Sequence, residues 1–176
     1  MKKKIWIVNA VGIFLLSFLC HFIYDWFPNK LTCLFFPVNE SIWEHVKMLF
    51  TTNIVWGVIA FFLYRKIKIP THNLFPYLWT SGVLNCIILL ALYLPLYYLL
   101  GEHMILTLII LFVSIIITQY ITSRINERKE AKLWNFLSLI AIVLTFCLLG
   151  YLTYHPLKTE LFYDKIEEKY GLWTLK

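Results

Sequence analysis

The segment 36–47, FPVNESIWEHVK, contains the side chains most suited to chemistry. Four ionisable residues occur together there, just before a long apolar run: Glu40, Glu44, His45 and Lys47. Carboxylates and imidazoles act as general bases and as metal ligands, and a lysine neutralises a neighbouring carboxylate. Ionisable groups at membrane depth are costly, so we expect these four residues to be catalytic.

The same segment has the features of a helix start. If Asn39 is the N-cap, its side chain accepts an early backbone N–H, and Glu40 lies in the first turn, where the helix dipole favours an anion. Val38 and Trp43 then occupy the positions of a hydrophobic staple. Glu40 and Glu44 are one turn apart and repel each other when ionised, so the pair needs a metal cation, a shared proton or a lysine. The alternative is a capped helix entrance with an internal salt bridge in the interfacial layer.

The composition indicates an integral membrane protein. Of the 176 residues, 60% are hydrophobic and 15% are charged, which is far from the balance of a soluble domain. We predict an all-α, polytopic helix bundle over residues 1–155, followed by a polar tail at 156–176. Runs of about 20 apolar residues are long enough to cross a bilayer. Five such runs are expected, at about 5–26, 41–64, 77–100, 104–121 and 133–154. Asn85 and Gln119 lie inside spans and are expected to form interhelical hydrogen bonds.

The distribution of charge predicts the orientation, because short loops rich in lysine and arginine stay cytoplasmic. Ten of the sixteen basic residues fall on one side of a five-span chain: Lys2, Lys3, Lys4, Arg65, Lys66, Lys68, Arg124, Arg128, Lys129 and Lys132. Eight of the ten acidic residues fall on the other side. We therefore expect a cytoplasmic N-terminus and an outer tail. The net charge of +6 is interpreted as an insertion signal, and nucleic acid is not an expected partner.

This topology gathers histidines at the outer membrane surface. The expected ligands of a metal ion there are His21, Asp25, His45, His103 and His155. Zinc or another divalent metal in such a cleft activates water for hydrolysis or polarises a carbonyl or phosphoryl group. The alternatives are a structural hydrogen-bonded pair of His21 with Asp25, a solvated His103 and a helix end at His155. The four cysteines are scattered singly, so neither a disulfide framework nor a cysteine-based zinc site is expected.

The tail 156–176 is too polar to span a bilayer, yet it contains aromatic clusters around Phe162 and Trp173. We expect it to lie on the outer membrane surface as an amphipathic lid, or to be a frayed end near the headgroups. As a lid it would contact substrate, and Trp43, Phe162 and Asp164 are the expected contacts.

Three blocks of the chain carry a resemblance: HFIYDW at 21–26, PVNESIWEH at 37–45 with Lys47, and LFYD at 161–164 before Tyr170-Gly171. Together they resemble an uncharacterised family of small bacterial multi-pass membrane proteins with a PVNESxWEH motif. Lys165 stands where that pattern has a proline. The resemblance implies a compact bundle in the bacterial cytoplasmic membrane and brings no known activity.

Two classes of function stay open from these residues. One is a metal-dependent hydrolase or transferase acting on a lipid or lipid-linked substrate at the outer leaflet. The other is a non-catalytic binding or accessory subunit, or a small transporter coupled to a cation or proton. Membrane lipids are expected partners in either case.

Overall fold

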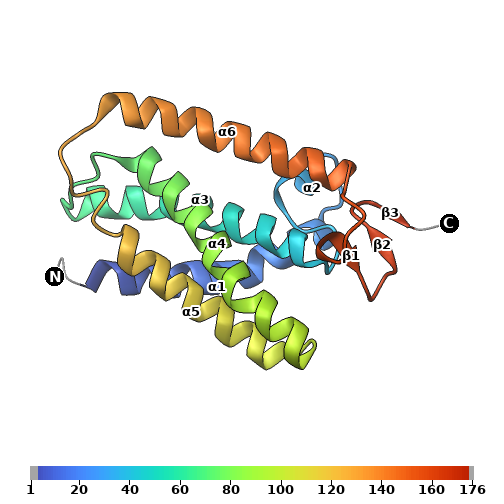
Figure 1. The fold of residues 1–176 in the computed structure, drawn as a ribbon. Coiled ribbons are helices and arrows are strands. Elements are labelled where there is room, and N and C mark those ends of the chain that lie inside the picture. Colours follow the sequence, from blue (N-terminus) through green and yellow to red (C-terminus); the bar gives the residue numbers. More distant parts are fainter. Residues whose placement is uncertain (1–3, 175–176) are drawn as a thin grey trace.

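Five long apolar helices make up most of the protein. The computed structural model describes residues 4–174, and within that range it contains six α-helices (Figure 1). The five long ones are 19 to 27 residues in length and apolar enough to cross a membrane. They are α1 (Ile5–Trp26), α3 (Ile42–Lys66), α4 (Leu74–Leu100), α5 (Met104–Thr122) and α6 (Lys132–Tyr154), and the sixth is the short α2 (Thr32–Phe35). This confirms the predicted all-α class with five candidate spans.

The helix boundaries agree with the prediction to within three residues, and the largest difference is at the start of α4. The helix begins at Leu74 rather than near residue 77 and includes Pro76 in its first turn. Proline is tolerated there because its missing N–H would have no helical partner. The Asn73 side chain connects this start to the loop after α5, since it donates to the Ile125 carbonyl and accepts the Ala131 N–H.

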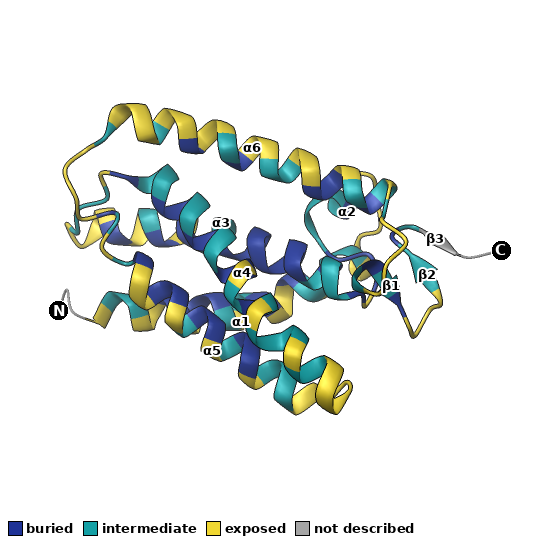
Figure 2. Cartoon of the chain, viewed as in Figure 1, coloured by how far each residue is buried: buried dark blue, intermediate teal, exposed yellow. Residues whose placement is uncertain are grey.

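The helices pack as a bundle in which α6 is peripheral. Helix α1 contacts α3 and α5, α4 contacts α3, α5 and α6, and α2 contacts α6 (Figure 1). Helices α3 and α4 approach closely through small residues, as membrane helices do. A Cβ at Gly82 would lie 2.7 Å from the Phe50 ring, and one at Gly57 would lie 2.1 Å from Leu78. The outer faces of α5 and α6 are exposed and apolar (Figure 2), as expected for surfaces in contact with lipid.

A polar network connects the interiors of α3, α4 and α5. Gln119 accepts a hydrogen bond from Tyr77 at 2.7 Å and donates to Ser81 at 2.6 Å, and Ser81 donates to Asn53 at 2.9 Å. The interhelical role predicted for Gln119 is therefore confirmed. Asn85, expected to act similarly, is fully buried, and its side-chain amide has no hydrogen-bond partner among residues 4–174.

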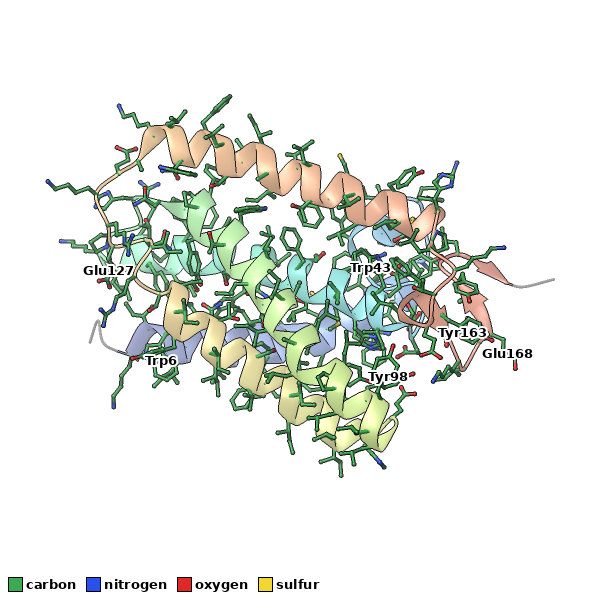
Figure 3. All side chains as sticks on the ribbon, in the orientation of Figure 1. Trp6, Trp43, Tyr98, Glu127, Tyr163 and Glu168 are labelled. Carbon is green, nitrogen blue, oxygen red and sulfur yellow. The ribbon has the colours of Figure 1, made fainter. Side chains whose placement is uncertain are left out.

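The two ends of the bundle differ in charge. The start of α1 and the connections 67–73 and 123–131 lie at one end, and the connections 27–41 and 101–103 lie at the other with the tail (Figure 1). Trp6 and Glu127 mark the first end, and Trp43, Tyr98 and Tyr163 mark the second (Figure 3). Eight of the ten predicted inner basic residues are thus at one end, while Lys2 and Lys3 lie outside the described residues.

The tail folds back as a small sheet. A 3-10 turn, η2 (Glu160–Phe162), precedes β1 (Tyr163–Asp164), β2 (Lys169–Tyr170) and β3 (Trp173–Thr174). These strands pair antiparallel in the order β1-β2-β3, with Tyr163 opposite Tyr170. The sheet lies beyond the start of α3 (Figure 1). It therefore reaches the segment in which the chemistry was expected.

Candidate metal centre

The true start of α3 decides which side chains meet. Ser41 is the N-cap, and its hydroxyl accepts the Glu44 N–H at 3.4 Å. The prediction that Asn39 is the N-cap was wrong by two residues, and the staple of Val38 with Trp43 does not apply. Asn39 instead accepts the Ser41 N–H and donates to the Gly171 carbonyl, both at 2.9 Å. It therefore joins this turn to the tail.

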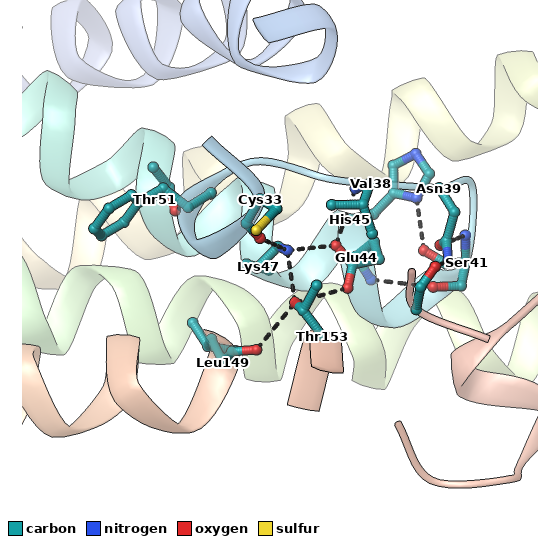
Figure 4. Close-up of polar contacts among 12 residues, drawn as sticks. Cys33, Val38, Asn39, Ser41, Glu44, His45, Lys47, Thr51, Leu149 and Thr153 are labelled. Carbon is teal, nitrogen blue, oxygen red and sulfur yellow. Dashed lines mark hydrogen bonds and ion pairs between the residues drawn. The ribbon is translucent and has the colours of Figure 1, made fainter. Parts of the chain in front are cut away.

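Glu44 and Lys47 form an ion pair that is closed to ligands. Their charged atoms are 2.6 Å apart, and both side chains are almost completely buried (Figure 4). Lys47 also donates to the Cys33 carbonyl and to the Thr153 hydroxyl, each at 2.8 Å. Glu44 accepts the Val38 N–H at 3.1 Å and the Thr153 hydroxyl at 3.2 Å. All three ammonium protons are thus used, and the pair connects α3 with α2 and α6.

Glu40 lies outside the helix, and its carboxylate has different partners from that of Glu44. One of its carboxylate oxygens is 3.5 Å from the Nε2 atom of His21 and 3.5 Å from that of His45. The two Nε2 atoms are 3.2 Å apart. The Glu40 N–H donates to a carboxylate oxygen of Asp164 at 2.9 Å. The two glutamates that were expected to share one site therefore belong to separate clusters.

These three side chains form a group able to hold a metal ion. Four tetrahedral ligands at the usual zinc distance of about 2.05 Å are separated from one another by about 3.3 Å. The measured separations of 3.2, 3.5 and 3.5 Å agree with that value. Two histidines and one glutamate also form a common ligand set of catalytic zinc, in which a fourth position is left for water.

The local hydrogen bonds prepare the group for a cation. The Nδ1 atom of His45 lies 2.9 Å from the Ser41 carbonyl. Because a carbonyl only accepts, Nδ1 is the protonated nitrogen and Nε2 presents its lone pair. The hydrogen bond from His21 lowers the pKa of Glu40, and the positive charges of His45 and His21 lower it further when these rings are protonated, against the opposing effect of partial burial. The carboxylate is therefore held in the ionised form that binds metal.

The group borders a cavity of about 420 Å³. His21, Glu40 and His45 line it, as does Glu102 from the turn between α4 and α5. Its other walls are mainly apolar side chains of α1, α4 and α5. A volume of this size is typical of ligand pockets, which range from about 300 to 1,000 Å³. The arrangement thus places candidate metal ligands at the edge of a space that can hold a guest.

The other expected ligands lie outside the group. Asp25, His103 and His155 are all exposed. The His103 Nε2 atom lies 2.9 Å from the Leu100 carbonyl, and the His155 ring packs 4.7 Å from the Tyr151 ring. The five-span topology brings all three to the same end as His21, but it does not bring them together with it.

The expected substrate contacts hold the tail in place. The Trp43 ring stacks on Phe162 with the ring centroids 4.6 Å apart. Asp164 is fully buried, and besides the Glu40 N–H it accepts the N–H groups of Ile166 and Glu167. Asp164 is thus a positioning residue for Glu40 in this structure. Contact of Trp43, Phe162 and Asp164 with substrate stays a prediction.

Two contributors were missed by the sequence analysis. Ser41 with Glu44 three residues later matches the start of a capping box, so this N-cap had a detectable signal. Glu102 is one of the eight acidic residues expected on the outer side, and no sequence signal indicates that it lines the cavity.

Comparison with known proteins places the chain in a family. The model of a family of unknown function, DUF6512, matches residues 1–172. The chain belongs to DUF6512. Neither a curated protein nor a solved structure matches this DUF6512 member. The family brings no assigned activity, so the geometry of His21, Glu40 and His45 is the basis for a functional proposal.

Proposed function

We propose that this DUF6512 protein is a metal-dependent hydrolase or transferase that acts on a lipid or lipid-linked substrate. Its zinc, or another divalent metal, is bound by His21, Glu40 and His45. The observation that supports this is the near-tetrahedral spacing of the three ligand atoms beside a cavity. Five apolar spans make membrane lipids the expected surroundings.

The residues around the proposed metal have separate tasks. A zinc ion with one open position supplies a Lewis acid and lowers the pKa of a bound water to about 7. His45 is oriented by the Ser41 carbonyl, and Glu40 by the bond from its N–H to Asp164. Glu102 lines the same cavity and is proposed as the proton acceptor. Glu44 and Lys47 are assigned a structural role in place of the expected catalytic one, because each is fully engaged by the other and by Thr153.

The proposed location is the bacterial cytoplasmic membrane, with the metal centre facing outward. The clustering of basic residues at the opposite end of the bundle supports this orientation. The bundle 1–155 and the tail 156–176 are proposed to act together. The tail would hold the Glu40 loop through Asp164 and through the bond of Asn39 to Gly171.

A transporter is the alternative, and the packing disfavours it. An apolar cluster lies next to the cavity and contains Ile13, Leu49, Leu89, Leu111 and Ile115. A cation or proton moving inward would have to cross this cluster to reach the network around Gln119. Apolar layers without polar partners are costly for ions.

Metal analysis tests the proposal. Protein purified in detergent and incubated with zinc should contain about one zinc per chain, as expected for a three-ligand site. Glu40→Gln and His45→Ala should lose this zinc, whereas the matched control His103→Ala should retain it. The proposal fails if the wild type binds no zinc, cobalt or manganese, or if His103→Ala loses metal as completely as His45→Ala.

A further inference from the structure

In a bilayer crossed by the five long helices, the cavity beside the metal ligands would lie mainly within one leaflet. Its wall on α5 extends from Met104 to Leu111, which is about 10 Å at the helical rise of 1.5 Å per residue. The hydrocarbon core of a bilayer is about 30 Å thick, so one leaflet accounts for about 15 Å. The cavity starts at the end of the bundle that carries the tail, and its wall on α4 reaches Leu89, 11 residues before the end of that helix and thus about 16 Å from it.

The interior of the cavity is suited to hydrocarbon. Leu89, Leu108 and Leu111 line its walls. Three hydroxyl groups also border it, those of Ser17, Tyr93 and Thr107, and two of them donate their protons to their own helices. Ser17 donates to the Phe14 carbonyl at 2.7 Å, and Thr107 donates to the His103 carbonyl at 3.0 Å. A polar headgroup in this space would lose its hydration and find the Tyr93 hydroxyl as its main compensating donor, whereas a hydrocarbon chain needs none.

The carboxylate and imidazole groups of the cavity are confined to one end of it, and exposed apolar side chains also border it. His21, Glu40, His45 and Glu102 come from the outer ends of α1 and α3 and from the outer turns. Phe22 and Met104 also line the cavity and are exposed. A guest therefore meets hydrocarbon-like walls on one side and the metal ligands on the other.

From this geometry we infer that the cavity binds one hydrocarbon chain of an outer-leaflet lipid and presents the bond between that chain and its headgroup to His21, Glu40 and His45. The occupant is a lipid chain because the lining belongs to membrane spans and faces a single leaflet. The site accepts the chain, while the headgroup stays in the interfacial layer. The reaction at that bond rests on the proposed function, whereas occupancy of the cavity does not.

Photolabelling tests this occupancy directly. The protein is reconstituted in nanodiscs that contain phosphatidylglycerol with a diazirine near the middle of one acyl chain. After irradiation, labelled residues are mapped by mass spectrometry. Leu89 and Leu111 are buried and line the cavity, whereas Ile109 and Val113 are exposed to lipid. Label on Leu89 and Leu111 is expected, because bulk lipid does not reach them.

A matched pair of variants gives the control. Leu108→Trp fills the cavity, while Ile109→Trp adds the same ring to the neighbouring outward-facing position. Each methylene group displaced from an apolar site weakens binding by roughly fourfold, so Leu108→Trp should lower labelling of Leu111 by about tenfold or more. Ile109→Trp should leave labelling of Leu111 unchanged.

The outcomes separate this inference from the metal proposal. Labelling of Leu89 and Leu111 should persist after chelation and in Glu40→Gln, so loss of metal does not imitate an empty cavity. Label confined to Ile109 and Val113 in the wild type overturns the inference, even if zinc binds and even if Leu108→Trp fails to fold. Equal labelling of Leu111 in both tryptophan variants overturns it as well.

Discussion

Replacing Lys47 by methionine tests the division of the polar motif into two clusters. The ammonium of Lys47 is completely buried and makes three interactions, with Glu44, the Cys33 carbonyl and the Thr153 hydroxyl. Lys47→Met keeps an unbranched side chain that is one atom shorter and leaves the buried Glu44 carboxylate without its cation. Removing one partner of a buried ion pair destabilises a protein by about 3–5 kcal/mol, compared with about 0–1 kcal/mol for an exposed pair.

The double variant Glu44→Gln/Lys47→Met isolates the ion pair. It removes both charges, and the glutamine oxygen can still accept the Val38 N–H. Because replacing both partners avoids an uncompensated charge, the double variant should be more stable than Lys47→Met and more stable than Glu44→Gln. Reversible unfolding in detergent micelles, followed by circular dichroism, measures the three free energies of unfolding.

Zinc binding provides the second measurement for the same variants. Lys47 lies outside the group formed by His21, Glu40 and His45, so folded Lys47→Met should bind zinc with the stoichiometry of the wild type. A loss of stability below about 1 kcal/mol, typical of exposed pairs, would contradict the buried ion pair. Loss of zinc in a folded Lys47→Met protein would contradict the separation of the two clusters.

Four further variants test the positioning of the site and the stability of the elements around it. Asp164→Asn should weaken zinc binding by about 10- to 100-fold, the range for partners that orient metal ligands, because the Glu40 N–H loses a charged acceptor. Zinc titration against a chelator measures this affinity, and an unchanged affinity would refute the positioning role of Asp164. Ser41→Ala should lower the free energy of unfolding by about 1 kcal/mol through loss of the N-cap. Asn39→Ala removes the hydrogen bond to the Gly171 carbonyl, so the tail should be cleaved faster by protease. Gln119→Leu should cost about 0.6–1.7 kcal/mol in the same unfolding experiment with zinc binding unchanged, since the network lies apart from the metal ligands.

The sequence was sufficient for the fold class and for the helix positions. Each long helix is a continuous apolar run. The hydropathy of such a run depends only on its own residues, and an apolar run of this length forms a helix in a bilayer whatever its neighbours are. The same reasoning predicted that Gln119 would form interhelical hydrogen bonds, because a polar side chain inside a span needs a protein partner. It did not predict the buried Asn85 without a partner among residues 4–174.

Only the tertiary structure decided how the polar motif is used. By helical spacing, Glu40 and Glu44 belonged on one face. The bonds from Asn39 to Gly171 and from the Glu40 N–H to Asp164 accompany a helix start at Ser41, which leaves Glu40 outside the helix. These contacts join residues more than 120 positions apart in the chain, so no local pattern contains them.

Contacts between residues distant in the chain also decide which of the histidines are candidate metal ligands. Four histidines reach the end of the bundle that carries the tail, because the alternating direction of the five long helices places their segments there. Binding one ion requires ligand atoms within about 3.3 Å of one another, a precision set by helix packing and by the folded tail. His21 and His45 meet that requirement beside Glu40, whereas His103 and His155 face outward. The sequence by itself determined at which end of the bundle these groups lie, and side-chain packing determined which of them meet.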